Sequence, residues 1–150
     1  MGSSTAERGG RGQAGYSTRT LPAKLGLKSG DRVAILYAPK GYQATLGELP
    51  PQVKILGGRA SQLDFIQLFA RSALDLEQTF AKAAARLKPD GMLWISWPKK
   101  SSLFAGDLNE NIVREVGLSA GLVDVKVAAI DTNWSGLKFV YRLKDRPKAD

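Results

Sequence analysis

The sequence predicts an α/β fold in which a mainly parallel sheet lies between two layers of helices and ends in an antiparallel hairpin. Two observations lead to this prediction. Through most of the chain, short apolar stretches alternate with segments of helical periodicity, which is typical of a sheet covered by helices on both faces. Towards the C-terminal end, two neighbouring stretches alternate apolar and polar residues, as an antiparallel pair half exposed to solvent does.

The first predicted elements are short. The letters LPAKLG indicate a helix at Pro22–Leu25 that Gly26 ends, and a turn is expected at Ser29–Asp31. Arg32–Tyr37 then contains the continuous apolar run VAILY. Such a run is typical of a strand that is buried on both faces, so we place the first strand there.

A second helix and two more strands follow the first strand. Gly41–Leu49 is expected to form a short helix that Pro50–Pro51 end. Val53–Leu56 is the second predicted strand, closed by Gly57–Gly58, and Leu63–Phe69 is the third.

The best-defined helix is expected to begin after Ser72, because a serine is a favoured N-cap and Asp75 follows three positions later. Apolar residues then recur at helical spacing on one face. They are Leu76, Phe80, Ala83 or Ala84, and Leu87. We expect Pro89 and Gly91 to end this helix.

The remaining elements are a strand, a helix and the hairpin. Met92–Trp97 is the fourth predicted strand, and a helix is expected from an N-cap at Asp107 to an end at Gly117. Its inward face consists of Leu108, Ile112, Val113 and Val116. The stretches LVDVKVAAID and WSGLKFVYRL then form the hairpin, with a turn near Thr132–Asn133.

We divide the chain into a disordered N-terminal tail at residues 1–16, a single Rossmann-like α/β domain at residues 17–143 and a basic C-terminal tail at residues 144–150. The formal net charge is +8. Residues 29–141 carry thirteen basic and eleven acidic side chains, so most of the excess charge lies near the two ends. Basic tails of this kind favour solubility or weak, unspecific contact with polyanions.

The composition excludes several classes of function. The chain has no cysteine and no histidine, which excludes disulfides, thiolate nucleophiles, Cys/His zinc sites and histidine-based acid–base catalysis. No apolar run approaches the roughly 20 residues that a membrane helix needs. We expect a cytoplasmic protein without a membrane partner, because the N-terminus also lacks the apolar core of a secretory signal. Asp64, Asp124 and Asp131 lack metal-ligand spacing, so no metal is expected.

Two loops that follow strands contain the candidate ligand-binding residues. Ligands of parallel sheets bind beyond the carboxyl ends of the strands, where APKGY follows the first strand and WPKK follows the fourth. Lysines there can hold a phosphate or carboxylate, and tryptophans can stack on a base. The candidates are Lys40, Gly41, Tyr42, Trp97, Lys99, Lys100 and Trp134. The alternative is that the tryptophans close the core and the lysines form a solvated rim; no catalytic residue is assigned.

The second half of the sequence resembles the C-terminal half of class I S-adenosylmethionine (SAM)-dependent methyltransferases. The stretches LKPDGMLWISWP and SAGLVDVKVAAID carry this resemblance, from about Leu63 to Leu143, and it implies the same fold. After the first strand the family has an acidic residue and a glycine-rich loop, whereas this chain has YAPKGY. After the second strand the family has an acid that holds the ribose hydroxyls, whereas this chain has Gly57, Gly58 and Arg59. We therefore expect no cofactor, with SAM disfavoured.

The sequence from about Gly15 to Leu143 also resembles a family of short bacterial proteins catalogued as a domain of unknown function. The stretches GYS, KLG, APKGY, WISWPKK, GLVDVKV and WSGLKFV carry this resemblance in combination. It implies the same fold and a bacterial cytoplasmic origin, without a known activity.

Three hypotheses for function follow. The first is a methyltransferase-like module, not a conventional enzyme, which binds a small anionic ligand or a protein partner in a crevice formed by Lys40, Lys99 and Lys100. The second is a divergent methyltransferase or another nucleotide-using transferase. The third is a weak association with RNA or DNA, and the oligomeric state stays open in all three.

Overall fold

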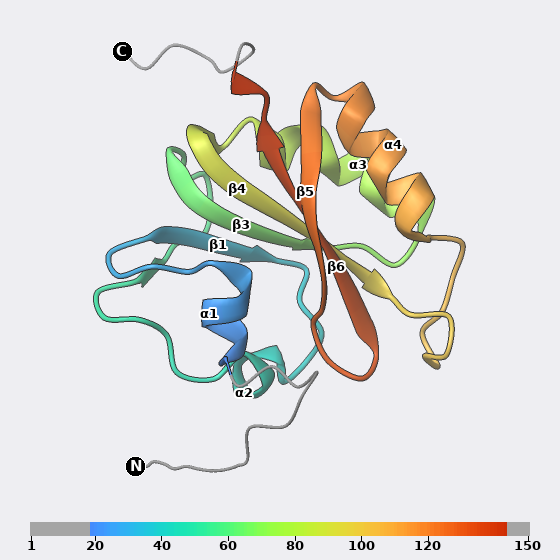
Figure 1. The fold of residues 1–150 in the computed structure, drawn as a ribbon, viewed down its shortest axis with the longest axis horizontal. Helices are drawn as coiled ribbons and strands as arrows, with labels where there is room; N and C mark the ends of the chain where they lie inside the picture. Colours follow the sequence, from blue (N-terminus) through green and yellow to red (C-terminus); the bar gives the residue numbers. More distant parts are fainter. Residues whose placement is uncertain (1–18, 144–150) are drawn as a thin grey trace.

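A six-stranded mixed sheet forms the centre of the protein. The computed structural model describes residues 19–143, so the expected tails at residues 1–16 and 144–150 lie outside the described residues. The strands are β1 (Arg32–Leu36), β2 (Lys54–Ile55), β3 (Leu63–Phe69), β4 (Leu87–Pro98), β5 (Leu122–Ala129) and β6 (Trp134–Tyr141). They are ordered β2-β1-β3-β4-β6-β5, with β2, β1, β3 and β4 parallel and the β5–β6 hairpin antiparallel (Figure 1).

Helices cover both faces of this sheet. They are α1 (Leu21–Leu25), α2 (Tyr42–Leu46), α3 (Ala73–Ala84) and α4 (Glu110–Ser119). Buried side chains of α1 and α2 belong to one apolar cluster, and buried side chains of α3 and α4 belong to a second cluster. The expected three-layer α/β architecture, mainly parallel with a C-terminal antiparallel hairpin, is confirmed.

The two central parallel strands β3 and β4 supply side chains to both clusters. Phe65 and Trp94 lie in the cluster beneath α1 and α2, whereas Ile66 and Ile95 lie in the cluster beneath α3 and α4, and none of the four is exposed. The indole Nε1 of Trp94 donates a hydrogen bond of 2.8 Å to the carbonyl oxygen of Leu25. This bond ties the end of α1 to the middle of the sheet.

The structure confirms the N-cap of α3 and corrects the segment that follows the helix. Ser72 Oγ accepts a hydrogen bond from the backbone N–H of Asp75 at 3.1 Å. However, Leu87 belongs to β4, and Pro89 and Gly91 lie inside that strand instead of ending a helix. The strand tolerates them because its pairing with β3 shifts register between Leu63 and Phe65.

The start and end of α4 also differ from the sequence prediction. Asn109, not Asp107, is the N-cap, and its Oδ1 accepts a hydrogen bond from the N–H of Ile112. Asp107 instead accepts a hydrogen bond from the N–H of Ala73, the first residue of α3. Gly117 lies within α4, not at its end.

Several elements are shorter than predicted, among them the second helix and the second strand. The helix expected at Gly41–Leu49 is limited to Tyr42–Leu46, because Gly47 adopts a φ of 81° and ends it. The second strand is limited to Lys54–Ile55, which pair only with β1 at the edge of the sheet. The short strand β2 pairs with the first two residues of β1, whereas α2 follows the loop that leaves the carboxyl end of β1.

Gly117→Ala is expected to destabilise the protein, because a Cβ at Gly117 would lie 2.0 Å from Cε1 of the fully buried Phe139 ring. Overpacking of a core costs about 1–3 kcal/mol, against which alanine gains about 1 kcal/mol in helix propensity. Urea denaturation should therefore give a lower midpoint for Gly117→Ala. Ser119→Ala, on the exposed side of the same helix, is the control and should stay within about 0.5 kcal/mol of wild type. An unchanged midpoint for Gly117→Ala would contradict the close packing of α4 on β6.

Candidate functional site

The carboxyl ends of β1, β3 and β4 lie at the same edge of the sheet, because these strands are parallel (Figure 1). Ligands of open α/β sheets bind at this edge. The side chains that leave it include Tyr37 after β1, Arg71 after β3 and Lys99 after β4.

Tyr37 is the first residue beyond β1, and its backbone is strained. Its φ is 59°, in the left-handed region that costs a side-chain-bearing residue roughly 1–2 kcal/mol. The side chain is also 72% exposed, so burial does not offset this cost. Strained backbone is frequent at ligand sites, which makes Tyr37 a candidate functional residue.

Two hollows adjoin Tyr37 on the side of α3. The first hollow has a volume of about 330 Å³ and is lined by Tyr37, Phe69, Arg71, Asp75, Gln78 and Thr79. The second hollow has a volume of about 390 Å³ and is lined by Leu36, Tyr37, Gly58, Arg59, Gln78, Thr79, Lys82, Ala83 and Arg86. Because Tyr37, Gln78 and Thr79 line both, the hollows are neighbours. Each volume is at the lower end of the roughly 300–1,000 Å³ of small-molecule sites.

A third hollow of about 300 Å³ lies at the loop APKGY that the sequence singled out. Gly41 and Tyr42 line it, together with Pro39, Ile35 and neighbouring residues, but Lys40 does not. Gly41 has a φ of 82°, and a Cβ built there would meet nothing within 4 Å. The predicted glycine therefore serves the turn into α2 and borders a hollow.

Tyr42 begins a buried chain of hydrogen bonds. Its hydroxyl donates to Gln67 Oε1 at 2.8 Å, and Gln67 Nε2 donates to Ser96 Oγ at 3.1 Å. Burial raises the pKa of Tyr42 to about 12, and the negative charge of Asp131 acts in the same direction. Tyr42 is thus a neutral donor that positions α2 on β3 and β4.

Trp134 is a buried aromatic residue at the start of β6. Only 3% of it is exposed, and its ring meets Phe69 edge to face at 5.1 Å between centroids. Tyr42 packs on the same Phe69 at 4.8 Å, so the fold brings these two predicted residues together. Arg71 lies over the rings of Trp134 and Phe104, at 5.8 and 5.0 Å from their centroids.

The backbone of the WPKK segment lies beside this group, because Pro98 pairs with Trp134 and the N–H of Lys99 donates to the carbonyl oxygen of Asn133 at 2.8 Å, but the Trp97 side chain does not join it. Trp97 is only 5% exposed and belongs to the cluster beneath α3 and α4, on the other face of the sheet from Trp134. Lys99 is half-buried and Lys100 exposed. Because β3 separates β1 from β4, the loops carrying Lys40 and Lys99 begin roughly 10 Å apart. The predicted role of these lysines stays a prediction.

Several residues of the two hollows were not candidates from the sequence. They are Tyr37, Arg59, Arg71, Asp75, Lys82 and Arg86. Tyr37 was expected inside the first strand, at Arg32–Tyr37, but β1 ends at Leu36 and leaves Tyr37 at the edge where ligands bind. The cations come from separate segments that only the fold brings together.

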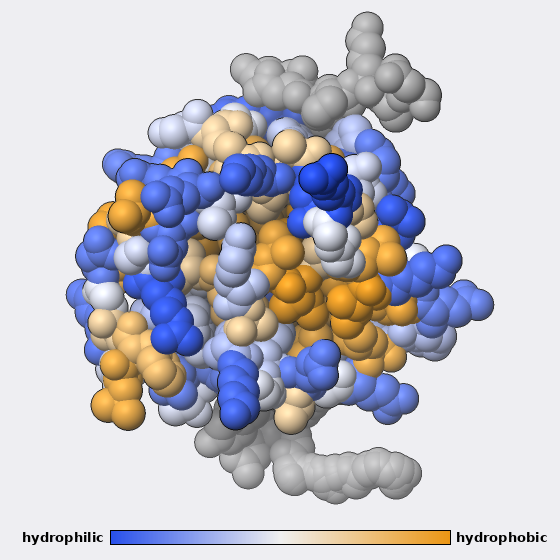
Figure 2. Space-filling model, turned by 180° about the vertical axis from the view of Figure 1, so that it is seen from behind, coloured by the Kyte–Doolittle hydropathy of each residue, from blue (hydrophilic) through white to orange (hydrophobic). Residues whose placement is uncertain are grey.

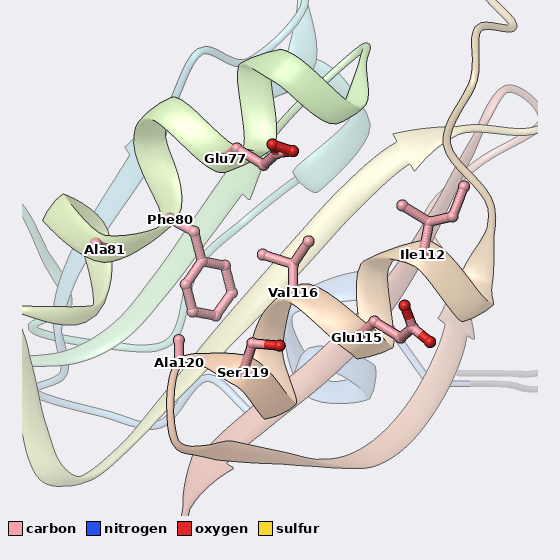
Figure 3. Close-up of a pocket in the computed structure, with 8 residues that line it drawn as sticks. All are labelled: Glu77, Phe80, Ala81, Ile112, Glu115, Val116, Ser119 and Ala120. Atoms are coloured by element: carbon pink, nitrogen blue, oxygen red, sulfur yellow. The ribbon is translucent and has the colours of Figure 1, made fainter.

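Another open groove lies between α3 and α4. It has a volume of about 490 Å³, with Phe80 and Val116 projecting toward one another and Glu77 and Glu115 as its acidic residues (Figure 3). From behind, the surface also has apolar side chains that gather in one area bordered by hydrophilic ones (Figure 2). Apolar areas of this kind are typical of surfaces that bind ligands or partners.

Residues 19–143 contain neither a metal-binding cluster nor a membrane-spanning helix. No group of three or more acidic side chains there is placed to hold a metal ion. In the same residues, no helix is long and apolar enough to cross a membrane.

The fold is that of class I SAM-dependent methyltransferases. A SAM-dependent methyltransferase from Aquifex aeolicus is 18% identical, with a TM-score of 0.56, over 79% of this chain and 86% of that one. The magnesium protoporphyrin IX methyltransferase of Synechocystis PCC 6803 is 11% identical to this chain in two structures. The structure with bound SAH has a TM-score of 0.52 over 81% of this chain and 78% of that one. The structure with bound SAM has a TM-score of 0.53 over 81% of this chain and 74% of that one. No family model and no curated protein matches the chain. The resemblance to a family of unknown function therefore stays a prediction.

The expectation of no cofactor is wrong. It rested on the absence of a glycine-rich loop after the first strand and of an acid after the second. The fold nevertheless resembles that of a methyltransferase solved with bound SAM and with bound SAH, and this finding overturns the expectation. The local sequence after two strands was too narrow a criterion, because the edge of the sheet also offers side chains from β3 and α3.

Tyr42→Phe is expected to lower the free energy of unfolding at pH 7 by about 1–3 kcal/mol, because it leaves the buried Gln67 Oε1 without its donor. The pKa of Tyr42 is about 10 in the unfolded chain and about 12 in the folded one. Its stabilising contribution is therefore complete below pH 10 and is lost as the pH rises towards 12. Urea denaturation at pH 7 and pH 11 should give a smaller alkaline loss for Tyr42→Phe than for wild type. An equal loss in both would contradict the buried, protonated hydroxyl.

Proposed function

We propose that the protein is a divergent methyltransferase-fold protein that binds SAM in the first hollow, beside Tyr37. The observation that carries this proposal is an exposed, strained aromatic residue at the carboxyl end of β1, with a hollow of about 330 Å³ next to it. The SAM- and SAH-bound structures of similar fold support the choice of ligand.

The residues of the first hollow suit the chemical groups of SAM. The ring of Tyr37 offers a face on which an adenine can stack, a contact that contributes about 1–3 kcal/mol per base. The Asp75 carboxylate can accept hydrogen bonds from hydroxyl or amino groups and complements a positive charge. Arg71 can pair with a carboxylate, and Gln78 and Thr79 offer further polar atoms.

Bound SAM would supply an electrophilic methyl group. Around it, the chain itself binds and orients the ligand, since it has neither histidine nor cysteine to act as base or nucleophile. Asp75 is the one carboxylate in the lining of the first hollow among the described residues, so it is the residue available to accept a proton there.

The lysine crevice is the competing proposal for the same edge. In it, Lys40, Lys99 and Lys100 bind a small anionic ligand or a protein partner. A weak association with RNA or DNA through the basic residues near the ends of the chain is a separate alternative. Lys40 and Lys100 are exposed and Lys99 is half-buried. The effect of replacing these lysines on ligand binding can therefore be compared directly with the effect of replacing Tyr37.

Tyr37→Gly is expected to weaken SAM and SAH binding by about 10- to 100-fold, because it removes the stacking face. The fold should persist, since glycine relieves the left-handed strain at this position. Isothermal titration calorimetry with SAM and with SAH measures the affinity, and thermal denaturation checks the fold.

Gln52→Gly is the matched control, because Gln52 also has a positive φ of 64° and lines neither hollow. It should bind SAM as wild type does, as should Lys99→Ala/Lys100→Ala. No binding of SAM or SAH to wild type at millimolar concentration would refute the proposal. Loss of binding in Lys99→Ala/Lys100→Ala but not in Tyr37→Gly would transfer the site to the lysine crevice.

A further inference from the structure

The second hollow has a strongly one-sided charge. Arg59, Lys82 and Arg86 line it, and no carboxylate is among its lining residues in the described part of the chain. Arg59 follows β2, whereas Lys82 and Arg86 come from the end of α3 and the residues after it. Three cations around about 390 Å³ repel one another unless an anion lies between them.

Arg86 gives an independent sign that a partner is missing. Its Nε donates a hydrogen bond of 2.6 Å to the carbonyl oxygen of Ala60, which holds the guanidinium against the loop after β2. Its Nη2 is buried and has no hydrogen-bond partner within residues 19–143. A buried donor without a partner costs about 1–3 kcal/mol, and such groups are commonly completed by an ion or an ordered water.

The loop beside these cations is open to a ligand. A Cβ built at Gly57 or at Gly58 would meet nothing within 4 Å, and Gly58 adopts a φ of 59°. The backbone can therefore be approached closely at this point. Gln78 and Thr79 add uncharged polar groups, while Leu36 and Ala83 supply apolar walls.

This combination favours a phosphate ester over a bare anion. Guanidinium groups match the geometry of phosphate oxygens, and a lysine adds a compact positive charge. Apolar walls and the Tyr37 ring need an organic body to cover them, which inorganic phosphate lacks. Cations near the end of α3 also complement the helix dipole, but that effect explains neither Arg59 nor the unpaired Nη2.

We propose that the second hollow is a binding site for the phosphate group of a small phosphorylated molecule, held by Arg59, Lys82 and Arg86. This site does not depend on SAM, because its three cations are absent from the first hollow. A phosphorylated nucleoside would place its base at Tyr37 and its phosphate at the cations, and it would then compete with SAM for the Tyr37 ring.

The test uses the full chain in a phosphate-free buffer, with adenosine 5′-monophosphate, adenosine, ribose 5-phosphate and inorganic phosphate as probes. Calorimetry should give at least 10-fold tighter binding of adenosine 5′-monophosphate than of adenosine, and weaker binding of inorganic phosphate than of either ester. Arg59→Gln/Lys82→Gln should lose at least 10-fold in affinity for both esters. Arg86 is left unchanged because its bond to Ala60 supports the fold.

Lys99→Gln/Lys100→Gln is the matched control, because it removes the same charge from another loop at the carboxyl edge. It should keep the wild-type affinity for adenosine 5′-monophosphate. Equal losses in the two double variants, equal affinity for adenosine and its monophosphate, or no binding of either ester would each overturn the phosphate site. A titration of SAM into Arg59→Gln/Lys82→Gln separates the two proposals. We expect this variant to keep SAM binding while it loses binding of the phosphate esters. If wild type does not bind SAM either, only the SAM site is refuted.

Discussion

Both faces of the central strands β3 and β4 are apolar, and the need to cover them fixes where the four helices lie. Side chains such as Phe65 and Ile66, neighbours on β3, point to opposite faces and are both fully buried. Helices α1 and α2 cover one face of these strands and helices α3 and α4 cover the other, and the β1–β2 edge of the sheet is covered less. β2 contributes only two paired residues, both exposed. The open space beside β1, and therefore the hollows around Tyr37, follow from this uneven cover.

Polar groups inside the same centre hold the edge in place. The chain from Tyr42 through Gln67 to Ser96 crosses from α2 to two strands, and its donors and acceptors are matched. A matched buried network contributes little net stability but strongly disfavours other arrangements of the same elements. It fixes α2 and the APKGY turn against the sheet, so the loop after β1 leaves in one defined direction. The strain at Tyr37 is sustained by this fixed surrounding structure.

Periodicity and caps predicted the parts of the fold that local physics determines. β3 follows from its apolar stretch, the start of α3 follows from Ser72, and the hairpin follows from the alternation of apolar and polar residues. The cap of α4 could not be chosen in the same way, because Asp107 and Asn109 are both good N-caps and a contact of Asp107 with Ala73 decides between them. The extent of β4 also depends on a shift of register against β3, which no local pattern contains.

The candidate site was harder to predict, because its charges are close in space and not in sequence. A count along the chain places the excess positive charge near the ends and leaves residues 29–141 almost neutral. Within that nearly neutral part, the fold sorts the charges: Arg71 and Asp75 line the first hollow, whereas three cations line the second. Because the interaction between charges weakens with distance, three cations gathered at one hollow act on a nearby ligand even though the net charge of residues 29–141 is small. A ligand spanning both hollows would therefore be oriented by charge, with its anionic end towards Arg59 and any cationic group towards Asp75.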